Sequence, residues 1–594
     1  MKKKLTARFA FFNVRVVVRL CMVLAGTLLA LLSFDRFSVH AQQKYSHTTR
    51  STDPLVPALF DCSKIHELGI DKQMNFRAGA IMIFCGEAQV ASASSAGTFS
   101  RLGQQLLQPV RYGTTDVDLI TGTETFPHIT QSTTFTAGNS DNPLQIVVAY
   151  NDARGINASP SSGAGASVST DGGNTFTRLT TASGQSPFSD SGSPVVLYNK
   201  PSQTWFTIWL DGDCPGLGGF KSTTPWDPDS WTHFCIHTGG SDDRESGWAD
   251  NNPSSPFYGR MYVSWNDFSV GAAALSVTFS TDNGATWHSP VLVSNTGTFI
   301  RDVQITGDLA TGDVYIAGMD EGGGGFPHND TNYIFKSTDG GNTWTNTYTG
   351  PTFPGPGVGF VGYFAVMFAD GGGYWRYEGW GEPAALNGVV HLVYAQHGTG
   401  SDPGDIYYIR STDGGVTFGT PFKLNTDATT RAQWQPSLSA ATDGSLFATW
   451  YDQRETDSCA KGNPAVPCYR IWGRKSTDNG VSWLPDMLVS DIVTPLPDQP
   501  DPGIVATYAS DYDYGSSALD QHLHAWVDGR VTISGISQQD AFFDRELTSA
   551  KTPTPTPTAT PTSTPTATPR ATPTPRTIPT PRLRPTPPPR PTPR

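Results

Sequence analysis

Short runs in which apolar and polar residues alternate recur along most of the chain. Seven of them are rich in β-branched and aromatic residues and end at positions 152, 211, 267, 320, 396, 452 and 528. Six end in Asp, and the run over 390–396 ends in Gln instead. Such alternation with turn residues on both sides predicts β-strands. The steps between run ends, 53 to 76 residues, suit the four-stranded blade of a β-propeller, longer where a blade carries an insertion.

A second repeat runs in phase with the first. Five segments share the pattern Ser-Thr-Asp, then Gly at the fifth place, then Thr or Ser and an aromatic residue, and their acidic residues are Asp171, Asp282, Asp339, Asp413 and Asp478. A degenerate sixth copy spans 222–231. In each copy we expect the carboxylate to accept turn N–H groups and the glycine to adopt a positive φ. The aromatic residue should anchor the hairpin in the core.

Six copies of this turn beside seven strand runs predict an all-β propeller of seven four-stranded blades, with six blades as the alternative. The last blade lacks the turn, and we expect N-terminal chain around Leu106–Ile120 to complete it, which would remove exposed sheet edges. The tryptophans at the same place in four strand runs, Trp209, Trp265, Trp450 and Trp526, are expected in the blade core.

The five repeated turns resemble the Asp boxes of bacterial neuraminidase (BNR) repeats. Over about residues 120–545 the chain is therefore similar to the sialidase-like β-propellers. Asp boxes also occur in propellers that are not sialidases, so the resemblance implies the fold and leaves the chemistry open.

The two ends of the chain differ in composition from the repeats. Residues 1–41 combine a basic start, an apolar run and small residues at a cleavage site, which predicts a signal peptide, with an uncleaved anchor as the alternative. Residues 549–594 are mostly Pro and Thr, which predicts a disordered, extended tail, either wall- or surface-associated or merely solvated. Between them we expect an N-terminal segment with a small, partly helical piece over 42–105 and the propeller over 106–548.

Charge narrows the choice of partner. The formal net charge of −13 combines +6 from the predicted signal peptide, +7 from the tail and −26 from residues 42–548. A surface this acidic repels nucleic acid and anionic membranes. We therefore expect an extracellular glycan or protein as the ligand of an exported protein that is not integral to a membrane after signal cleavage.

Six cysteines outside the predicted signal peptide fall into neighbouring pairs. Their spacing favours Cys62 with Cys85, Cys214 with Cys235, and Cys459 with Cys468, although six cysteines allow 15 pairings. Export to an oxidising compartment makes disulfides the default. No cysteine or histidine spacing indicates a metal site, and no cofactor is implied.

Charged residues gather where the first strand of several blades should begin. In a propeller blade, that position and the end of the second strand lie on one face, so these residues should line one mouth. The candidate ligand-binding residues are Arg244, Arg301, Arg376, Arg431, Asp302 and Asp511. Arginine forks suit a carboxylate ligand. The arginines that follow the acidic strand ends, Arg154, Arg454 and Arg530, recur so regularly that we expect structural ion pairs there.

The resemblance to sialidases suggests roles for some of these residues. Sialidases clamp a substrate carboxylate with three arginines and pair a Tyr nucleophile with a Glu. It implies a clamp of Arg244, Arg301 and Arg376, with Tyr512 as nucleophile and Glu245 or Glu378 as its base, and Glu382 competing for the base.

The chain also departs from the family's pattern. Phe126-Pro127-His128-Ile129 lacks the Arg of the family's first-blade motif, and Gln396-His397 stands where another Arg is expected. The early blades show no unambiguous acid/base Asp. Recognition of a glycan or protein at the charged mouth is therefore the favoured function. An exo-acting sialidase-type glycosidase is the alternative.

Overall fold

The computed structural model describes residues 50–90, 111–179, 190–271, 274–296, 299–368, 374–455, 467–497 and 499–548. The predicted signal peptide and Pro/Thr tail lie outside these ranges. The described helical elements are the α-helix α2 (Phe76–Phe84) and the 3-10 turns η1 (Cys62–Lys64), η2 (Ile70–Lys72), η4 (Ala153–Gly155) and η5 (Pro228–Ser230). Within these ranges, no helix is both long and apolar enough to cross a lipid bilayer.

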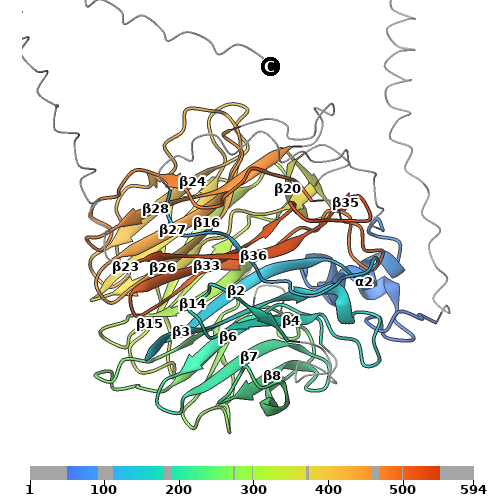
Figure 1. Ribbon diagram of the computed structural model, residues 1–594, viewed down its shortest axis with the longest axis horizontal. Coiled ribbons are helices and arrows are strands. Elements are labelled where there is room, and N and C mark those ends of the chain that lie inside the picture. The colour runs from blue at the N-terminus through green and yellow to red at the C-terminus, as the bar shows by residue number, and fades with distance from the viewer. Residues whose placement is uncertain are drawn as a thin grey trace, which may run out of the picture. The chain divides into compact units, whose positions relative to one another are not determined.

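The rest of the regular structure is β, as predicted (Figure 1). In chain order, the first four sheets are built from the following strands. They are β2 (Gln131–Asn139), β3 (Asn142–Asp152), β4 (Ala164–Ser169) and β5 (Thr177–Arg178); β6 (Val195–Asn199), β7 (Thr204–Asp211), β8 (Gly216–Ser222) and β9 (Thr232–Thr238); β10 (Asp242–Ala249), β11 (Met261–Asp267), β12 (Leu275–Ser280) and β13 (Val291–Ser294); and β14 (Ile300–Gly307), β15 (Val314–Asp320), β16 (Asn329–Ser337) and β17 (Thr345–Thr349), with β18 (Phe353–Pro354) beside β16.

Three further sheets follow the same plan. They are β22 (Glu382–Leu386), β23 (Val389–Gln396), β24 (Asp405–Ser411) and β25 (Phe422–Lys423); β26 (Gln433–Ala440), β27 (Leu446–Asp452), β28 (Cys468–Ser476) and β29 (Met487–Leu488), with β30 (Thr494–Pro495) beside β28; and β32 (Ser516–Ala518), β33 (Gln521–Asp528), β36 (Asp540–Leu547) and β1 (Val117–Asp118). A three-stranded insertion comprises β19 (Gly359–Val361), β20 (Phe364–Phe368) and β21 (Tyr374–Arg376), and a hairpin comprises β34 (Thr532–Ile533) and β35 (Ile536–Ser537).

Every strand run predicted from alternation is the second strand of its sheet. The four in-phase tryptophans are at most 2% exposed, which confirms that they belong to the core. Each sheet is an antiparallel meander in which the first strand is followed by its neighbours in chain order. The last is the exception, because its outermost strand β1 comes from the N-terminal side of the chain and pairs antiparallel with β36. This pairing lies in the segment predicted to complete the last blade.

The first strands of the sheets contact one another in a continuous order. β2 contacts β6, β6 contacts β10, and the series continues through β14, β22 and β26 to β32, which contacts β2. Figure 1 shows the orange-red strands β33 and β36 beside the blue β2, although they are far apart in the sequence. A short strand, β31 (Asp513–Tyr514), pairs in parallel with β2 and joins the last sheet to the first. We refer to these first strands as the inner strands.

The predicted partly helical piece is present over residues 50–90. Asn75 caps α2, because its side chain accepts a hydrogen bond from the Ala78 amide at 2.8 Å. The Cys62–Cys85 disulfide ties the two ends of this piece together, as predicted. Its apolar side packs against Ala153, Ile156, Ile504, Val505 and Tyr508, so the segment lies across one end of the inner strands.

Candidate functional site

Bulges in the inner strands set the directions of the charged side chains. The β10–β11 register shifts between Asp243 and Ser246, and the β14–β15 register shifts between Arg301 and Gln304. Arg244 (φ 59°) and Asp302 (φ 62°) lie inside these bulges in the left-handed region, which is unusual for residues other than glycine. A bulge inserts one residue and so redirects the side chains around it. The shift therefore brings Arg244 and Asp302 together.

Three of the four predicted arginines meet at this end of the inner strands. The Arg244 guanidinium lies 4.3 Å from the ring centre of Trp380, and that of Arg301 lies 5.9 Å from the same ring. Arg301 and Arg376 both lie over Phe364, at 5.3 and 4.9 Å. We call Arg244, Arg301 and Arg376, with these two aromatic residues, the arginine cluster.

Arg431 lies outside the arginine cluster. Its guanidinium donates a hydrogen bond to the main-chain carbonyl of Arg454 at 3.0 Å, within its own sheet. Arg376 does belong to the cluster but reaches it from β21 of the three-stranded insertion. The prediction placed it at the start of an inner strand, and that is wrong, because the inner strand of this sheet, β22, begins six residues later.

Carboxylates surround the arginine cluster. Arg244 pairs with Asp302 and also donates to the main-chain carbonyl of Asp511 at 3.3 Å. Arg376 lies 3.7 Å from an Asp511 carboxylate oxygen. Burial raises the pKa of Asp511 to about 6, against the opposing charges of Arg376 and Arg244. Both acidic residues predicted to bind ligand are thus paired with arginines of the cluster.

Arg301 is the arginine of the cluster whose guanidinium group lacks the most hydrogen bonds. It lies 3.1 Å from Glu321 and 3.5 Å from Asp243 and is fully buried. Among the described residues, none of its three guanidinium nitrogens has a hydrogen-bond acceptor of good geometry. Glu321 also accepts a hydrogen bond from the Trp380 indole at 2.8 Å. The sequence did not single out Glu321 or Trp380. Glu321 follows a strand end that belongs to the repeat, and Trp380 is an isolated aromatic residue.

Tyr512 packs directly beneath Arg244, with 4.9 Å between the guanidinium and the ring centre. Its hydroxyl donates to the main-chain carbonyl of Pro194 at 3.1 Å. Burial raises the pKa of the Tyr512 phenol well above its usual value, and the nearby Glu245 adds to this shift. Both carboxyl oxygens of Glu245 are buried, and no described residue donates a hydrogen bond to them. Tyr512 is therefore a protonated phenol without a hydrogen-bonded carboxylate.

The other two glutamates considered as the base have partners of their own. Glu378 accepts a hydrogen bond from the Ala365 amide at 2.5 Å and lies 3.3 Å from His328. Although burial opposes it, Asp330 and Glu378 raise the pKa of His328 to about 9. Glu382 accepts a hydrogen bond from the Leu438 amide at 2.6 Å, on the far side of the inner strands. The structure therefore brings neither of them to the Tyr512 hydroxyl.

The N-terminal segment covers the arginine cluster. Asn75 donates to Asp243 at 2.8 Å, the Met74 amide donates to the same carboxylate at 3.0 Å, and Arg376 donates to the Met74 carbonyl at 3.2 Å. Met74 is 1% exposed, and no arginine of the cluster is more than 7% exposed. The expected charged mouth is therefore a sealed interior in this structure.

The arginines at the strand ends form ion pairs within their sheets. Arg154 lies 3.2 Å from Asp152, Arg454 lies 2.7 Å from Asp452, and Arg530 lies 2.6 Å from Asp528. Their geometry supports the structural interpretation made from their repetition.

The repeated turns also have the expected hydrogen bonds. In the turn at 337–344, one oxygen of Asp339 accepts from the Ser337 hydroxyl and the Thr343 amide at 2.9 Å each, and the other accepts from the Thr343 hydroxyl at 2.7 Å. Asp171, Asp282, Asp413 and Asp478 accept the equivalent bonds in their own turns. These side chains are committed to local structure.

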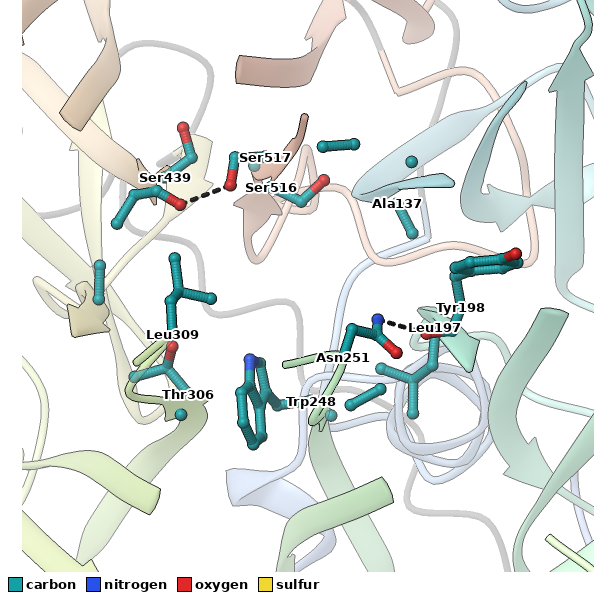
Figure 2. Close-up of a pocket in the computed structure, with 18 of the residues that line it drawn as sticks. Ala137, Leu197, Tyr198, Trp248, Asn251, Thr306, Leu309, Ser439, Ser516 and Ser517 are labelled. Atoms are coloured by element: carbon teal, nitrogen blue, oxygen red, sulfur yellow. Dashed lines mark hydrogen bonds between the residues drawn. The ribbon is translucent and has the colours of Figure 1, made fainter. Parts of the chain in front are cut away.

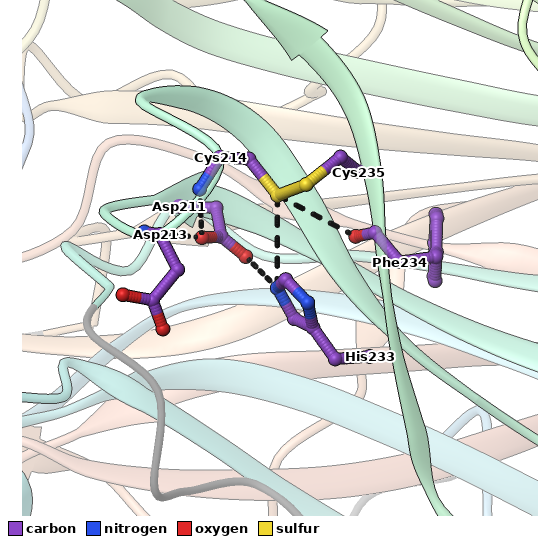
Figure 3. The surroundings of a disulfide bond; sticks show 6 residues. All are labelled: Asp211, Asp213, Cys214, His233, Phe234 and Cys235. Carbon is purple, nitrogen blue, oxygen red and sulfur yellow. Dashed lines mark hydrogen bonds and ion pairs between the residues drawn. A yellow bond between two sulfur atoms is a disulfide. The ribbon is translucent and has the colours of Figure 1, made fainter.

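Two of the three predicted disulfides are present among the described residues, Cys62–Cys85 and Cys214–Cys235. Cys468 is also disulfide-bonded, and Cys459, its predicted partner, lies outside the described residues. Figure 3 shows His233 directed at the Cys214–Cys235 bridge, where its ring nitrogen lies 2.7 Å from Asp211. Of the described residues, Cys214, His233 and Cys235 form the group close enough to hold a metal, but a disulfide offers no thiolate.

No protein-family model matches the chain, and no curated protein matches it in sequence. Solved structures do resemble it. A Dyadobacter fermentans protein of unknown function is 12% identical over 73% of this chain and 98% of its own, with a TM-score of 0.38. A Fusarium graminearum GH93 α-L-arabinofuranosidase is 10% identical over 52% of this chain and 93% of its own, with a TM-score of 0.32. A Hadza microbial sialidase is 14% identical over 70% of this chain and 66% of its own, with a TM-score of 0.33. The functional argument rests on the side chains of the site.

Proposed function

We propose that this chain is a secreted, seven-bladed Asp-box propeller that recognises a carboxylate-bearing extracellular glycan or protein at its arginine cluster. The seven meander sheets, the continuous contacts of their inner strands and the β1–β36 pairing support the blade number. The two disulfides fit the oxidising compartment that a secreted protein enters.

The observation that carries the proposal is the arrangement of the three guanidinium groups around shared aromatic rings, with donors left over. None of the three guanidinium nitrogens of Arg301 has a hydrogen bond of good geometry, although two of them lie near Glu321 and Asp243. The Nε atoms of Arg244 and Arg376 also have no hydrogen-bond acceptor among the described residues. Buried donors without acceptors are costly, at about 1–3 kcal/mol each, so a ligand that accepts from them would recover that free energy. A carboxylate matches the planar guanidinium fork.

Binding is favoured over catalysis by the environment of Tyr512. Its hydroxyl donates to the Pro194 carbonyl. Glu378 and Glu382 are bonded to other partners, and Glu245 makes no hydrogen bond with a described residue. A nucleophile requires a base within hydrogen-bond reach, although such contacts can tighten when substrate arrives. Sialidase-type hydrolysis is therefore the second candidate, supported by the position of Tyr512 directly beneath Arg244.

The test compares wild-type protein with Arg301→Lys, which keeps the charge and removes the guanidinium fork. We expect sialyllactose to bind wild type and to bind the variant at least tenfold more weakly, because a lysine offers no planar pair of donors. Arg454→Lys makes the same substitution in an ion pair outside the cluster and should bind like wild type.

Both variants should melt within a few degrees of wild type. Equal affinity of wild type and Arg301→Lys for the acidic ligand would contradict the proposal. Release of fluorophore from a sialoside by wild type, lost in Tyr512→Phe, would instead establish the glycosidase.

A further inference from the structure

The opposite end of the inner strands encloses a separate cavity. Its volume is about 410 Å³, within the roughly 300–1,000 Å³ of small-ligand sites. Its wall includes residues from each of the seven meander sheets. On β10, Trp248 of this cavity lies four positions after Arg244 of the arginine cluster, which corresponds to roughly 13 Å at ~3.3 Å per residue. The two sites therefore lie at opposite ends of the same strands.

The cavity wall combines polar and apolar surface and is largely uncharged. Figure 2 shows Thr306, Ser516, Ser517 and Asn251 around a common space. The Ser517 hydroxyl donates to the Ala440 carbonyl, and the Ser516 hydroxyl lies 3.0 Å from that of Thr136. The Ser439 hydroxyl is directed elsewhere and lies 2.7 Å from His522. Hydroxyl and amide groups both donate and accept hydrogen bonds, so they match a ligand that carries many hydroxyl groups.

Trp248 presents an indole edge to the cavity. It is half-buried, and Figure 2 shows its indole nitrogen directed into the enclosed space. One side of the indole stacks on Tyr262, with 5.8 Å between ring centres and 29° between planes. Gly307 fits against its six-membered ring, because a Cβ there would lie 2.1 Å from the indole. The ring is thus held in one orientation, with its polar N–H edge directed into the cavity.

Hydrogen bonds also fix the rim beside Trp248. Asn251 donates to the Tyr198 carbonyl and accepts from the Lys200 amide, both at 2.8 Å. Asn252 donates to the Ala310 carbonyl at 3.1 Å. These bonds join loops of three successive sheets, so little ordering is left to occur when a ligand binds.

The charged side chains of the wall are engaged within the protein. Lys200 pairs with Asp141 at 2.9 Å, and Asp250 bonds the Ser255 hydroxyl. Glu382 accepts from the Leu438 amide, and burial raises its pKa well above the usual range. The cavity therefore presents no unpaired charge to select an ionic ligand, in contrast to the arginine cluster.

We propose that this cavity is a second binding site, which takes the end of a neutral sugar chain beside the N–H edge of Trp248. An uncharged sugar combines hydroxyl groups, which the indole N–H and the wall hydroxyls can bond, with apolar C–H groups that can contact the apolar part of the wall. This site is distinct from the one proposed at the arginine cluster, although Gln304 and Tyr514 of its wall donate hydrogen bonds to Asp302, the partner of Arg244.

The test uses the full chain with cellobiose, lactose and maltose as probes, followed by saturation-transfer NMR and tryptophan fluorescence. We expect at least one of the three to bind wild type and to bind Trp248→Ala at least tenfold more weakly. Trp226→Ala is the matched control, because Trp226 is 42% exposed and does not line the cavity. Arg301→Lys should also leave this binding unchanged.

Thr306→Phe provides a second variant that keeps Trp248 and narrows the cavity, and it should also weaken binding at least tenfold. Absence of saturation transfer from wild type to all three sugars would overturn the proposal. So would equal affinity of wild type and either cavity variant, given the same melting temperature.

Discussion

At the scale of single residues, the unusual backbone conformations coincide with the charged site. Arg244 and Asp302 adopt positive φ values without being glycine, a conformation that costs on the order of 1–3 kcal/mol at each position. Their contact with each other offsets part of that cost. The sequence places both residues at strand starts, but it could not predict the bulges, because alternation continues through them.

Asp190 should make stability depend on pH. It is buried, accepts from the Gly163 amide at 2.8 Å and the Gly192 amide at 3.2 Å, and burial raises its pKa to about 7. A carboxyl whose folded pKa is raised stabilises the fold fully below the unfolded pKa near 4, and that stability is lost as pH rises towards 7. Asp190→Asn keeps an acceptor oxygen and removes the ionisation.

We therefore expect Asp190→Asn and wild type to have similar melting temperatures at pH 4, and the variant to have the higher one at pH 8. The gain in unfolding free energy at pH 8 should be a few kcal/mol at most. Thermal melts at several pH values measure this difference. Asp213→Asn, at an exposed position nearby, is the control and should show no such trend. A difference that stays constant from pH 4 to pH 8 would show that Asp190 does not titrate in this range.

At the scale of elements, local sequence patterns predicted the strands and turns of the repeat well, but they did not predict the structure of the insertions. The seven second strands and five turns follow from residues adjacent in sequence, because alternation and turn chemistry are local. Two steps between run ends were long, at 76 residues, which flags insertions without revealing their structure. One holds β19–β21 with Arg376, and the other holds Tyr508, Asp511 and Tyr512. Much of the arginine cluster therefore comes from the parts of the chain that break the repeat.

The repeated turns should contribute stability that depends on the charge of the Asp. Hydrogen bonds from Thr343 and Ser337 outweigh the small burial of Asp339 and lower its pKa. A carboxyl with a lowered folded pKa stabilises above the unfolded pKa and loses that effect as pH falls through the folded one. Asp339→Ala should therefore lower the melting temperature by about 1–3 °C at pH 7 and by less near pH 3.

Asp213→Ala serves as the comparison, since Asp213 is exposed and not in such a turn. Equal melting temperatures for Asp339→Ala and Asp213→Ala at pH 7 would mean that the turn bonds contribute nothing measurable.

At the scale of the whole β structure, the decisive feature is the cover over the arginine cluster. The sequence predicts a disulfide-pinned, partly helical segment at 54–90, and that element is present. It could not predict where the segment docks, because Met74 and Asp243 are 169 residues apart and no local pattern links them. The cover excludes solvent from the arginines, so access to the proposed ligand site depends on how firmly Met74 and Asn75 are held.

Asn75 has two separable roles in that cover. Its side-chain oxygen caps α2, and its amide nitrogen donates to Asp243. Serine is also a good N-cap but is too short to replace the second bond, whereas alanine replaces neither. We expect both Asn75→Ser and Asn75→Ala to loosen the cover, and only Asn75→Ala to destabilise α2.

Hydrogen–deuterium exchange followed by mass spectrometry separates these effects in the full chain. Peptides over 376–382 and 508–514 should exchange faster in both variants, because local opening exposes the backbone under the cover. Peptides over 76–84 should exchange faster in Asn75→Ala alone, and those over 411–418, in a distant turn, should match wild type. If 376–382 and 508–514 stay fully protected in both variants, the Asn75–Asp243 bond does not hold the cover closed, and access to the cluster must be controlled by the remaining contacts of residues 50–90.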